Sequence, residues 1–282
     1  MRFAAACSRR HKGQRGGRSA VRPPRAGYYR KLASSSGAGN APRPHGRRTD
    51  VNKAPRYFAL IPAAGGGTRF GGAVPKQYQM LGARTMLEHA VEAMLGDQRI
   101  ERVLIVVAPS DGRWARIGFD RRVAVATVGG ESRAESVRNG LKVLPGVADG
   151  DWVLVHDAAR PCLTRQDLVR LLDRVGSDPI GGLLALQVTD TVKRGVDFRV
   201  EQTLRRDETW LAMTPQMFRV GALRKALETH AKTHEVTDES AAMERMGLKP
   251  LLVAASPTNI KVTTRGDFTI AEAILRSQGR VK

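Results

Sequence analysis

The stretch FALIPAAGGGTRF at residues 58–70, followed by PKQY at residues 75–78, decides how this chain folds. An apolar run of strand length leads directly into small residues and three consecutive glycines, Gly65 to Gly67. Glycine lets the backbone turn sharply and come close to a ligand, and N–H groups left free in such a turn form an anion-binding concavity. With the cations Arg69 and Lys76 nearby, the stretch predicts a triphosphate cradle. The alternative is an ordinary strand-to-helix turn with solvated cations, because glycine-rich turns are common.

Two better-known phosphate-binding patterns do not fit this stretch. A Rossmann fingerprint needs glycine at its first, third and sixth places, but the sixth residue counted from Gly65 is Phe70. A P-loop ends in Gly-Lys-Ser or Gly-Lys-Thr, and neither tripeptide follows here. A dinucleotide-dependent oxidoreductase and a Walker-type NTPase are therefore both disfavoured.

The positive charge of the chain is concentrated at its N-terminus. The 282 residues carry a formal net charge of +20, and residues 1–56 supply 15 Lys and Arg against one acid, a net of +14. The remaining +6 belongs to residues 57–282, which therefore form a mildly basic body that suits an anionic small-molecule substrate. Two cysteines define no disulfide framework. No apolar run of about 18 residues exists, so no membrane span is expected.

Residues 1–56 are rich in Arg, Gly, Ser and Pro and nearly free of acids, which predicts a disordered basic extension. We expect the folded domain, with the candidate nucleotide loop, to span residues 57–282. Three roles are open for this extension: an organelle transit peptide, a nucleic-acid or surface-binding arm, or an upstream addition with no role in the fold. Glycine and proline pairs at residues 16–17 and 23–24 interrupt the amphipathic helix that a mitochondrial presequence needs. We favour the third role and a bacterial cytoplasmic location, with organelle import as the alternative.

Hydrophobic periodicity in the body predicts strands alternating with helices. Capping-box spacings at Thr85 and Ser132 predict helices through Leu95 and Leu144. Uninterrupted or short apolar runs predict strands at residues 102–108, 123–128, 152–156, 183–188, 251–254 and 260–262. Further helices are expected after Thr164 and at about residues 219–230, 238–246 and 266–276. This alternation predicts an α/β fold, with a mostly parallel sheet covered by helices on both faces.

The pattern breaks at residues 189–210. Two short β-prone runs flank a turn at Gly195-Val196-Asp197, which predicts a β-hairpin. The hairpin is polar and has no clear core face, so we expect it to project from the body as an arm.

A second cluster of polar residues lies at VLVHDAARP, residues 153–161. Ligands of open parallel sheets bind beyond the carboxyl ends of the strands, and Asp157 follows such a strand. Magnesium usually takes only one or two protein carboxylates and completes its shell with phosphates and water. Asp157 is therefore a candidate Mg²⁺ ligand, with a turn cap as the alternative. We expect His156 to be structural and Arg160 to pair with Asp157 or to shape the loop.

Five blocks of sequence follow one another in a fixed order. They are AAGGGTR at residues 63–69, PKQY at 75–78, HDAARP at 156–161, TDE at 237–239 and NIKVT at 259–263. Together they resemble the 2-C-methyl-D-erythritol 4-phosphate cytidylyltransferases of the non-mevalonate isoprenoid pathway, over about residues 57–278. The resemblance implies a Rossmann-like α/β/α nucleotidyltransferase fold, whose arm reaches across a homodimer. It also implies an enzyme in which the 4-phosphate of methylerythritol phosphate attacks the α-phosphorus of CTP and releases pyrophosphate.

The same resemblance implies a role for each matching residue. The nucleotide loop is implied to consist of Ala63, Ala64, Gly65 and Gly67. The base and ribose pocket corresponds to Gly130, Glu131 and Ser136. The catalytic cations correspond to Arg69, Lys76, Arg206 and Lys261, and the magnesium ligand to Asp157. The methylerythritol phosphate site corresponds to Thr191 and Arg206 on the arm, with Thr237 and Lys261 on the body.

Phosphoryl-type transfer needs positioning and charge stabilisation rather than a covalent nucleophile. The substrate phosphate is itself the nucleophile, so the cations and Mg²⁺ suffice. Two other functions remain open. A related cytidylyltransferase acting on ribitol 5-phosphate or another sugar phosphate would share the fold. A nucleic-acid-binding protein is suggested by the basic extension alone, and a body in a chain of only 14 aromatic residues (Phe 7, Trp 3, Tyr 4) offers no stacking surface.

Overall fold

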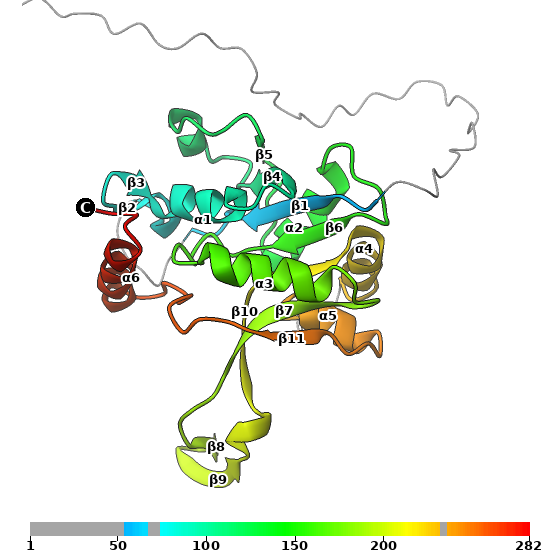
Figure 1. Cartoon of the computed structure of the whole chain (residues 1–282), viewed down its shortest axis with the longest axis vertical. Coiled ribbons are helices and arrows are strands. Elements are labelled where there is room, and N and C mark those ends of the chain that lie inside the picture. The colour runs from blue at the N-terminus through cyan, green and yellow to red at the C-terminus, as the bar shows by residue number, and fades with distance from the viewer. Residues whose placement is uncertain (1–53, 67–73, 232–235) are drawn as a thin grey trace, which may run out of the picture.

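The computed structural model describes residues 54–66, 74–231 and 236–282 (Figure 1). A seven-stranded sheet forms its centre, in the order β11-β7-β10-β6-β1-β4-β5. The strands are β1 (Tyr57–Pro62), β4 (Ile100–Val106), β5 (Val123–Ala126), β6 (Trp152–Val155), β7 (Gly181–Gln187), β10 (Trp210–Arg219) and β11 (Leu251–Ala254). Strand β1 lies between β4 and β6 and pairs parallel with both, so the predicted phosphate loop leaves the middle of the sheet.

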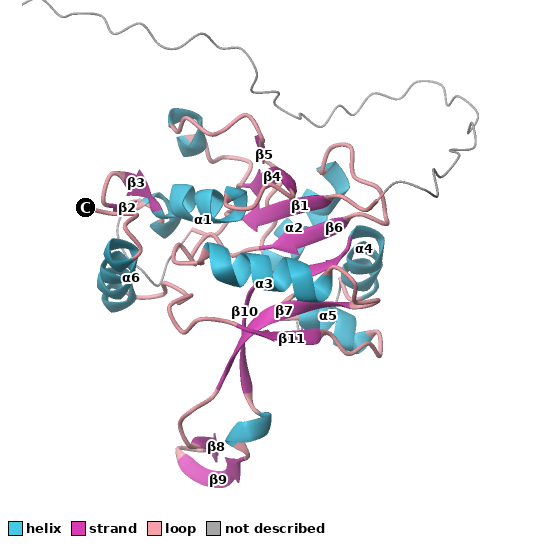
Figure 2. Cartoon of the chain, viewed as in Figure 1, coloured by secondary structure: helices cyan, strands magenta, loops and turns pink. Residues whose placement is uncertain are grey.

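Helices cover both faces of the sheet (Figure 2). They are α1 (Met86–Leu95), α2 (Arg133–Val143), α3 (Arg165–Val175), α4 (Val220–Thr229), α5 (Glu239–Arg245) and α6 (Arg265–Ser277). Alternate residues of β1 face opposite sides: Ile61 packs in one core cluster with Leu87 and Leu171 of α1 and α3. Leu60 packs in the other with side chains of α2, α4 and α5. The predicted α/β/α layering with a mostly parallel sheet is confirmed.

Strand β10 is the main element that the sequence did not predict. It runs antiparallel between β6 and β7, and its pairing with β7 is interrupted between Ala212 and Gln216. The interruption contains Thr214-Pro215, which is a cis peptide bond. Because proline has no N–H for a sheet ladder, the segment does not read as a central strand from sequence.

The predicted strand at residues 260–262 is wrong. Its backbone groups bond outside any sheet: the Val262 N–H donates to the Ala159 carbonyl at 2.8 Å, and the Val262 carbonyl accepts from Lys76 Nζ at 2.9 Å. This apolar segment therefore runs beside the loop after β6 instead of extending the sheet.

The two predicted capping boxes differ in outcome. Thr85 and Glu88 form both hydrogen bonds of the box at the start of α1. Ser132 caps α2 by accepting from the Glu135 N–H, but the Glu135 carboxylate accepts from the N–H of Glu131 at 2.9 Å instead of completing the box. Both helices begin where the spacing predicted.

The predicted arm is a hairpin of β8 (Val192–Val196) and β9 (Arg199–Leu204), followed by the 3₁₀ turn η4 (Arg206–Glu208). It extends away from the body (Figure 1). The turn lies one residue later than predicted, because Val196 still pairs with Arg199 while Asp197 and Phe198 adopt positive φ angles of 49° and 59°. The remaining elements are β2 (Met80–Leu81), β3 (Arg84–Thr85), η2 (Lys76–Tyr78) and η3 (Arg113–Arg116).

Arg56 contacts the body just before β1 begins. The backbone N–H and the guanidinium of Arg56 donate to the Asp151 carboxylate at 2.9 Å and 2.7 Å. No helix in the described part of the chain is long and apolar enough to cross a bilayer.

Gly140 sets how closely α2 approaches the sheet. An added Cβ would lie 2.6 Å from Val106 Cγ2 and 2.8 Å from Leu60 Cδ1, and both side chains are fully buried. Helix propensity alone would favour alanine by about 1 kcal/mol, but overpacking a core costs about 1–3 kcal/mol. We expect Gly140→Ala to lower the free energy of unfolding in urea. The control is Gly266→Ala in α6, where the nearest atom to an added Cβ is 3.6 Å away, and we expect no loss of unfolding free energy there. An equal gain of unfolding free energy in both variants would contradict this packing argument.

Candidate active site

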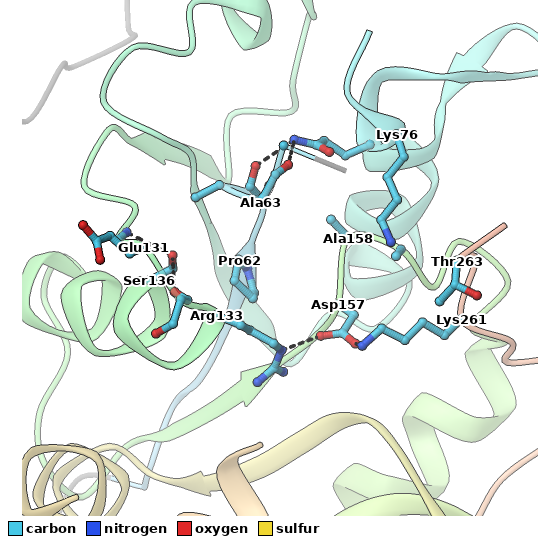
Figure 3. Close-up of a pocket in the computed structure, with 17 residues that line it drawn as sticks. Pro62, Ala63, Lys76, Glu131, Arg133, Ser136, Asp157, Ala158, Lys261 and Thr263 are labelled. Atoms are coloured by element: carbon cyan, nitrogen blue, oxygen red, sulfur yellow. Dashed lines mark hydrogen bonds and ion pairs between the residues drawn. The ribbon is translucent and has the colours of Figure 1, made fainter. Parts of the chain in front are cut away.

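A cleft of about 550 Å³ opens beyond the carboxyl ends of β1 and β6 and beside the start of α2 (Figure 3). Its wall comes from distant parts of the sequence. The lining residues are Pro62, Ala63, Ala64, Gly65, Gly66, Lys76, Gln77, Gly130, Glu131, Ser132, Arg133, Ser136, Asp157, Ala158, Ala159, Lys261 and Thr263. Nine of the residues singled out from the sequence are among them: Ala63, Ala64, Gly65, Lys76, Gly130, Glu131, Ser136, Asp157 and Lys261.

The loop after β1 forms one wall of the cleft. A Cβ added at Gly65 or Gly66 would meet no atom of the described residues within 4 Å, so packing among those residues does not require either glycine. Gly129 differs, since a Cβ there would lie 2.3 Å from the Cβ of Ala64 and 2.8 Å from the Val107 carbonyl oxygen. Glycine at position 129 therefore lets the loop before α2 approach the loop after β1, which closes this end of the cleft.

The start of α2 forms the adjoining wall. The Gly130 N–H donates to Ser136 Oγ at 3.1 Å, and this hydroxyl donates to the Ser132 carbonyl at 3.0 Å. These bonds fold residues 130–132 against the first turn of the helix. The N-terminus of a helix carries partial positive charge and unpaired N–H groups, so this wall favours a bound anion.

Asp157 lies at the centre of the site between two cations. Arg133 Nε donates to Oδ1 at 2.8 Å and Lys261 Nζ to Oδ2 at 2.9 Å, from opposite sides of the carboxylate (Figure 3). Burial would raise the pKa of Asp157, but the charges and hydrogen bonds of Arg133 and Lys261 outweigh it and hold the pKa well below its usual range. Asp157 is therefore ionised at neutral pH and anchors both cations.

Arg133 is fixed from its other side by Glu239 at the start of α5. Its two terminal nitrogens donate to the two Glu239 oxygens at 2.7 Å and 3.0 Å. Glu239 is fully buried, and burial raises its pKa above the usual value. A bidentate pair of this kind holds the guanidinium in one orientation, so Arg133 joins α2, β6 and α5 at one point.

His156 and Arg160 hold the segment that carries Asp157. His156 is buried, which lowers its pKa to about 4, and it contacts Thr214 Oγ1 and the Arg160 carbonyl. Thr214 Oγ1 also accepts from the Asp157 N–H at 3.0 Å. Arg160 donates to the Asn259 carbonyl at 2.6 Å and lies 4.0 Å from Asp157, so it shapes the loop more than it pairs with that carboxylate. His156 is a structural residue, as expected.

Three other predicted residues do not line this cleft. Thr237 is exposed just before α5. Thr191 and Arg206 are exposed on the arm, where the Arg206 guanidinium donates to the Thr189 carbonyl at 2.9 Å. Gly67 and Arg69 lie outside the described residues.

Eight lining residues had no site role predicted from the sequence, and two of them, Arg133 and Gln77, hold other parts of the site in place. Arg133 occupies the first position of α2, where a cation opposes the helix dipole, so its placement there was a signal that an anion lies nearby. Gln77 belongs to the quoted PKQY block, but its side chain donates to the carbonyls of Ala63 and Gly65 at 2.9 Å and 3.1 Å. Nothing in its spacing indicated those partners.

Comparison with known proteins places this architecture in one family. A model of the family described as 2-C-methyl-D-erythritol 4-phosphate cytidylyltransferase matches residues 57–277. The protein of that name from Dechloromonas aromatica is 48% identical over 229 residues, covering 79% of this chain and 99% of the relative. That from Laribacter hongkongensis is 50% identical over 223 residues, covering 78% and 96%. The crystal structure of the Francisella tularensis protein of the same name is 34% identical with a TM-score of 0.68, covering 78% of this chain and 100% of that one.

Removing the Arg133 guanidinium should show how much this side chain contributes to the free energy of unfolding through its two carboxylate partners. In Arg133→Met, Glu239 stays buried without a partner, and uncompensated buried charge costs about 3–5 kcal/mol. We expect urea unfolding at pH 7 to show a loss of this size, largely relieved in Arg133→Met/Glu239→Gln. Without Arg133 the pKa of Glu239 rises further, so the loss should shrink as pH falls from 7 to 5 and the carboxyl takes up a proton. A loss that is independent of pH and of Glu239→Gln would contradict the network.

Proposed function

The chain belongs to the 2-C-methyl-D-erythritol 4-phosphate cytidylyltransferase family, and we propose how its residues divide the work of that family's reaction. The chain is a nucleotidyltransferase of isoprenoid precursor synthesis. It transfers a cytidylyl group from CTP to 2-C-methyl-D-erythritol 4-phosphate, giving 4-diphosphocytidyl-2-C-methyl-D-erythritol and pyrophosphate. The family match disfavours ribitol 5-phosphate as the acceptor and a nucleic acid as the partner.

One observation carries the assignment. Lys76 and Lys261, from opposite halves of the domain, line the same cleft as the glycine loop and Asp157 (Figure 3). A cleft with cations on one side and a helix N-terminus on another suits a triphosphate and a second phosphate together.

In this proposal the cations of the chain stabilise the charge that develops during transfer. An oxygen of the acceptor's 4-phosphate forms a bond to the α-phosphorus, and the bond from that phosphorus to the leaving pyrophosphate breaks. Both reactants are anions, so attack requires their repulsion to be offset by positioned charges. Lys76 and Lys261 supply charge from the cleft, and Arg69 and Arg206 are assigned the same role. No side chain is needed as a covalent nucleophile.

The nucleotide is proposed to lie along the two loop walls. The loop after β1 receives the triphosphate, and the assigned residues are Ala63, Ala64, Gly65 and Gly67. The loop before α2 receives the base and ribose, and the assigned residues are Gly130, Glu131 and Ser136. The close approach of Gly129 to Ala64 sets the separation of these two walls.

Asp157 is the proposed magnesium ligand. No group of three or more His, Cys, Asp or Glu in the described residues forms a metal cage. One carboxylate facing a phosphate site nevertheless fits Mg²⁺, which completes its octahedral shell with phosphate oxygens and water. When bound, the metal would neutralise charge on the triphosphate. Arg133 would keep the Asp157 carboxylate in place, since Glu239 fixes that guanidinium.

The acceptor site is proposed to be shared between two chains of a homodimer. Thr237 and Lys261 would come from one body, and Thr191 and Arg206 from the arm of the partner. The arm exposes Val196, Phe198 and Val200 to 52–112% of their reference areas, and an isolated hairpin is marginal in water. A second chain would cover these side chains and bring the arm to the acceptor site. We also propose a cytoplasmic location in a bacterium.

Pyrophosphate release tests the assignment of the cleft. The full chain should release pyrophosphate with CTP and methylerythritol phosphate, and much more slowly with UTP, ATP, GTP or ribitol 5-phosphate. Lys76→Ala should lower kcat/KM by about 10²–10³, because a preorganised charge at the reacting phosphates is lost. Lys249→Ala, an exposed lysine outside the cleft, is the control and should remain near wild type. A loss below tenfold in Lys76→Ala would show that the triphosphate is held elsewhere.

Complementation tests the shared acceptor site. Arg206→Ala and Lys76→Ala chains, each nearly inactive alone, are unfolded and refolded together in equal amounts. Half of the dimers are then mixed, and each mixed dimer has one site with both defects and one with neither, so activity should recover to about a quarter of wild type. Lys76→Ala mixed with Lys261→Ala is the control: both defects lie in the body, so no site is restored. No recovery in the first mixture would contradict the exchange of arms.

A further inference from the structure

The side chain of Gln77 makes two hydrogen bonds that the proposed roles above do not use. It lies in η2 between Lys76 and Tyr78 and is only 5% exposed. Its single amide nitrogen donates to the carbonyl oxygens of Ala63 and Gly65, at 2.9 Å and 3.1 Å. One side chain thus holds two carbonyls of the loop that receives the triphosphate in the proposed function.

These two bonds determine which backbone groups of the loop can meet an anion. Carbonyl oxygens carry partial negative charge and repel phosphate, whereas N–H groups attract it. The carbonyls of Ala63 and Gly65 are turned toward Gln77 and occupied by its N–H groups. The N–H groups of Gly65 and Gly66 make no hydrogen bond to any residue that the structure describes, so they remain available as donors.

We propose that Gln77 is a positioning residue for nucleotide binding. Its amide donates to two carbonyls of the loop after β1 and so keeps these carbonyls turned away from a bound phosphate. The inference rests on the proposed function, because it assumes that this loop receives the triphosphate of CTP. Gln77 contributes no charge of its own. It acts by fixing peptide orientation, so its loss weakens nucleotide binding more than binding of the acceptor.

The neighbouring residue provides a matched control. Tyr78 is in the same 3₁₀ turn and is also buried. Its hydroxyl donates to Asp111 Oδ2 at 2.8 Å, and neither Tyr78 nor Asp111 lines the cleft. Tyr78→Phe removes one buried hydrogen bond of η2 without touching the loop. It reports what a purely structural defect in this turn does to binding and stability.

Two substitutions of Gln77 separate the lost donors from added charge. Gln77→Met keeps the length of the side chain but has no N–H group. Gln77→Glu keeps the shape, removes the donors and adds a negative charge beside the two carbonyls. Two ordinary hydrogen bonds correspond to about tenfold or more in an equilibrium constant. The Kd for CTP, measured by titration calorimetry with Mg²⁺ well below the melting temperature, should therefore rise about tenfold in Gln77→Met and further in Gln77→Glu.

The pattern across the variants decides the inference. It is supported if Tyr78→Phe binds CTP within twofold of wild type and the KM for methylerythritol phosphate stays within about threefold in Gln77→Met. It is overturned if Gln77→Met and Gln77→Glu melt earlier but bind CTP as wild type does, or if Tyr78→Phe weakens CTP binding equally. Failure of the wild-type chain to bind CTP would overturn the proposed function instead. If Gln77→Glu does not fold, Gln77→Met alone decides between these outcomes.

Discussion

The site depends on one ion network, in which Arg133 lies between the buried carboxylates of Asp157 and Glu239. Two carboxylates cannot be buried in the ionised state without partners. The Arg133 guanidinium supplies positive charge and hydrogen bonds to both. Lys261 supplies a second positive charge to the Asp157 carboxylate. The network joins the start of α2, the end of β6 and the start of α5, so three elements that carry proposed ligand-binding residues are fixed relative to one another. The main contribution of such a network is geometric, since buried ion pairs contribute little net stability.

The sheet explains why these residues meet. Strands β1, β4, β5 and β6 are parallel, so the loops that follow them leave the sheet at one edge. The glycine loop follows β1, the segment leading to α2 follows β5, and Asp157 follows β6. Antiparallel β10 adds Thr214 beneath Asp157, where its hydroxyl accepts the Asp157 N–H and contacts His156. The carboxylate is thus held through its backbone as well as through its oxygens.

Much of this could be predicted from local sequence. The glycine-rich turn after β1, the helix start at Thr85 and the acid after β6 each follow from short-range chemistry that tertiary structure did not override. Strand β10 could not, because Thr214-Pro215 interrupts its pattern, and the apolar run at residues 260–262 bonds to a loop instead of a strand. The pairing of Arg133 with Glu239 spans 106 positions, and no periodicity encodes such a contact. The roles of Thr191, Arg206 and Thr237 remain predictions for a related reason, since they depend on how two chains meet.

The ionisation of Asp157 tests the central claim most directly, because the network exists to hold that carboxylate charged inside the cleft. The ¹³C resonance of its carboxyl carbon, assigned by its loss in Asp157→Asn, can be followed by NMR from pH 7 downward in the full chain. The account predicts no titration near the ordinary aspartate pKa of about 3.9, and an upward shift of the midpoint in Arg133→Met. A midpoint at or above the ordinary value in the wild-type protein would contradict it.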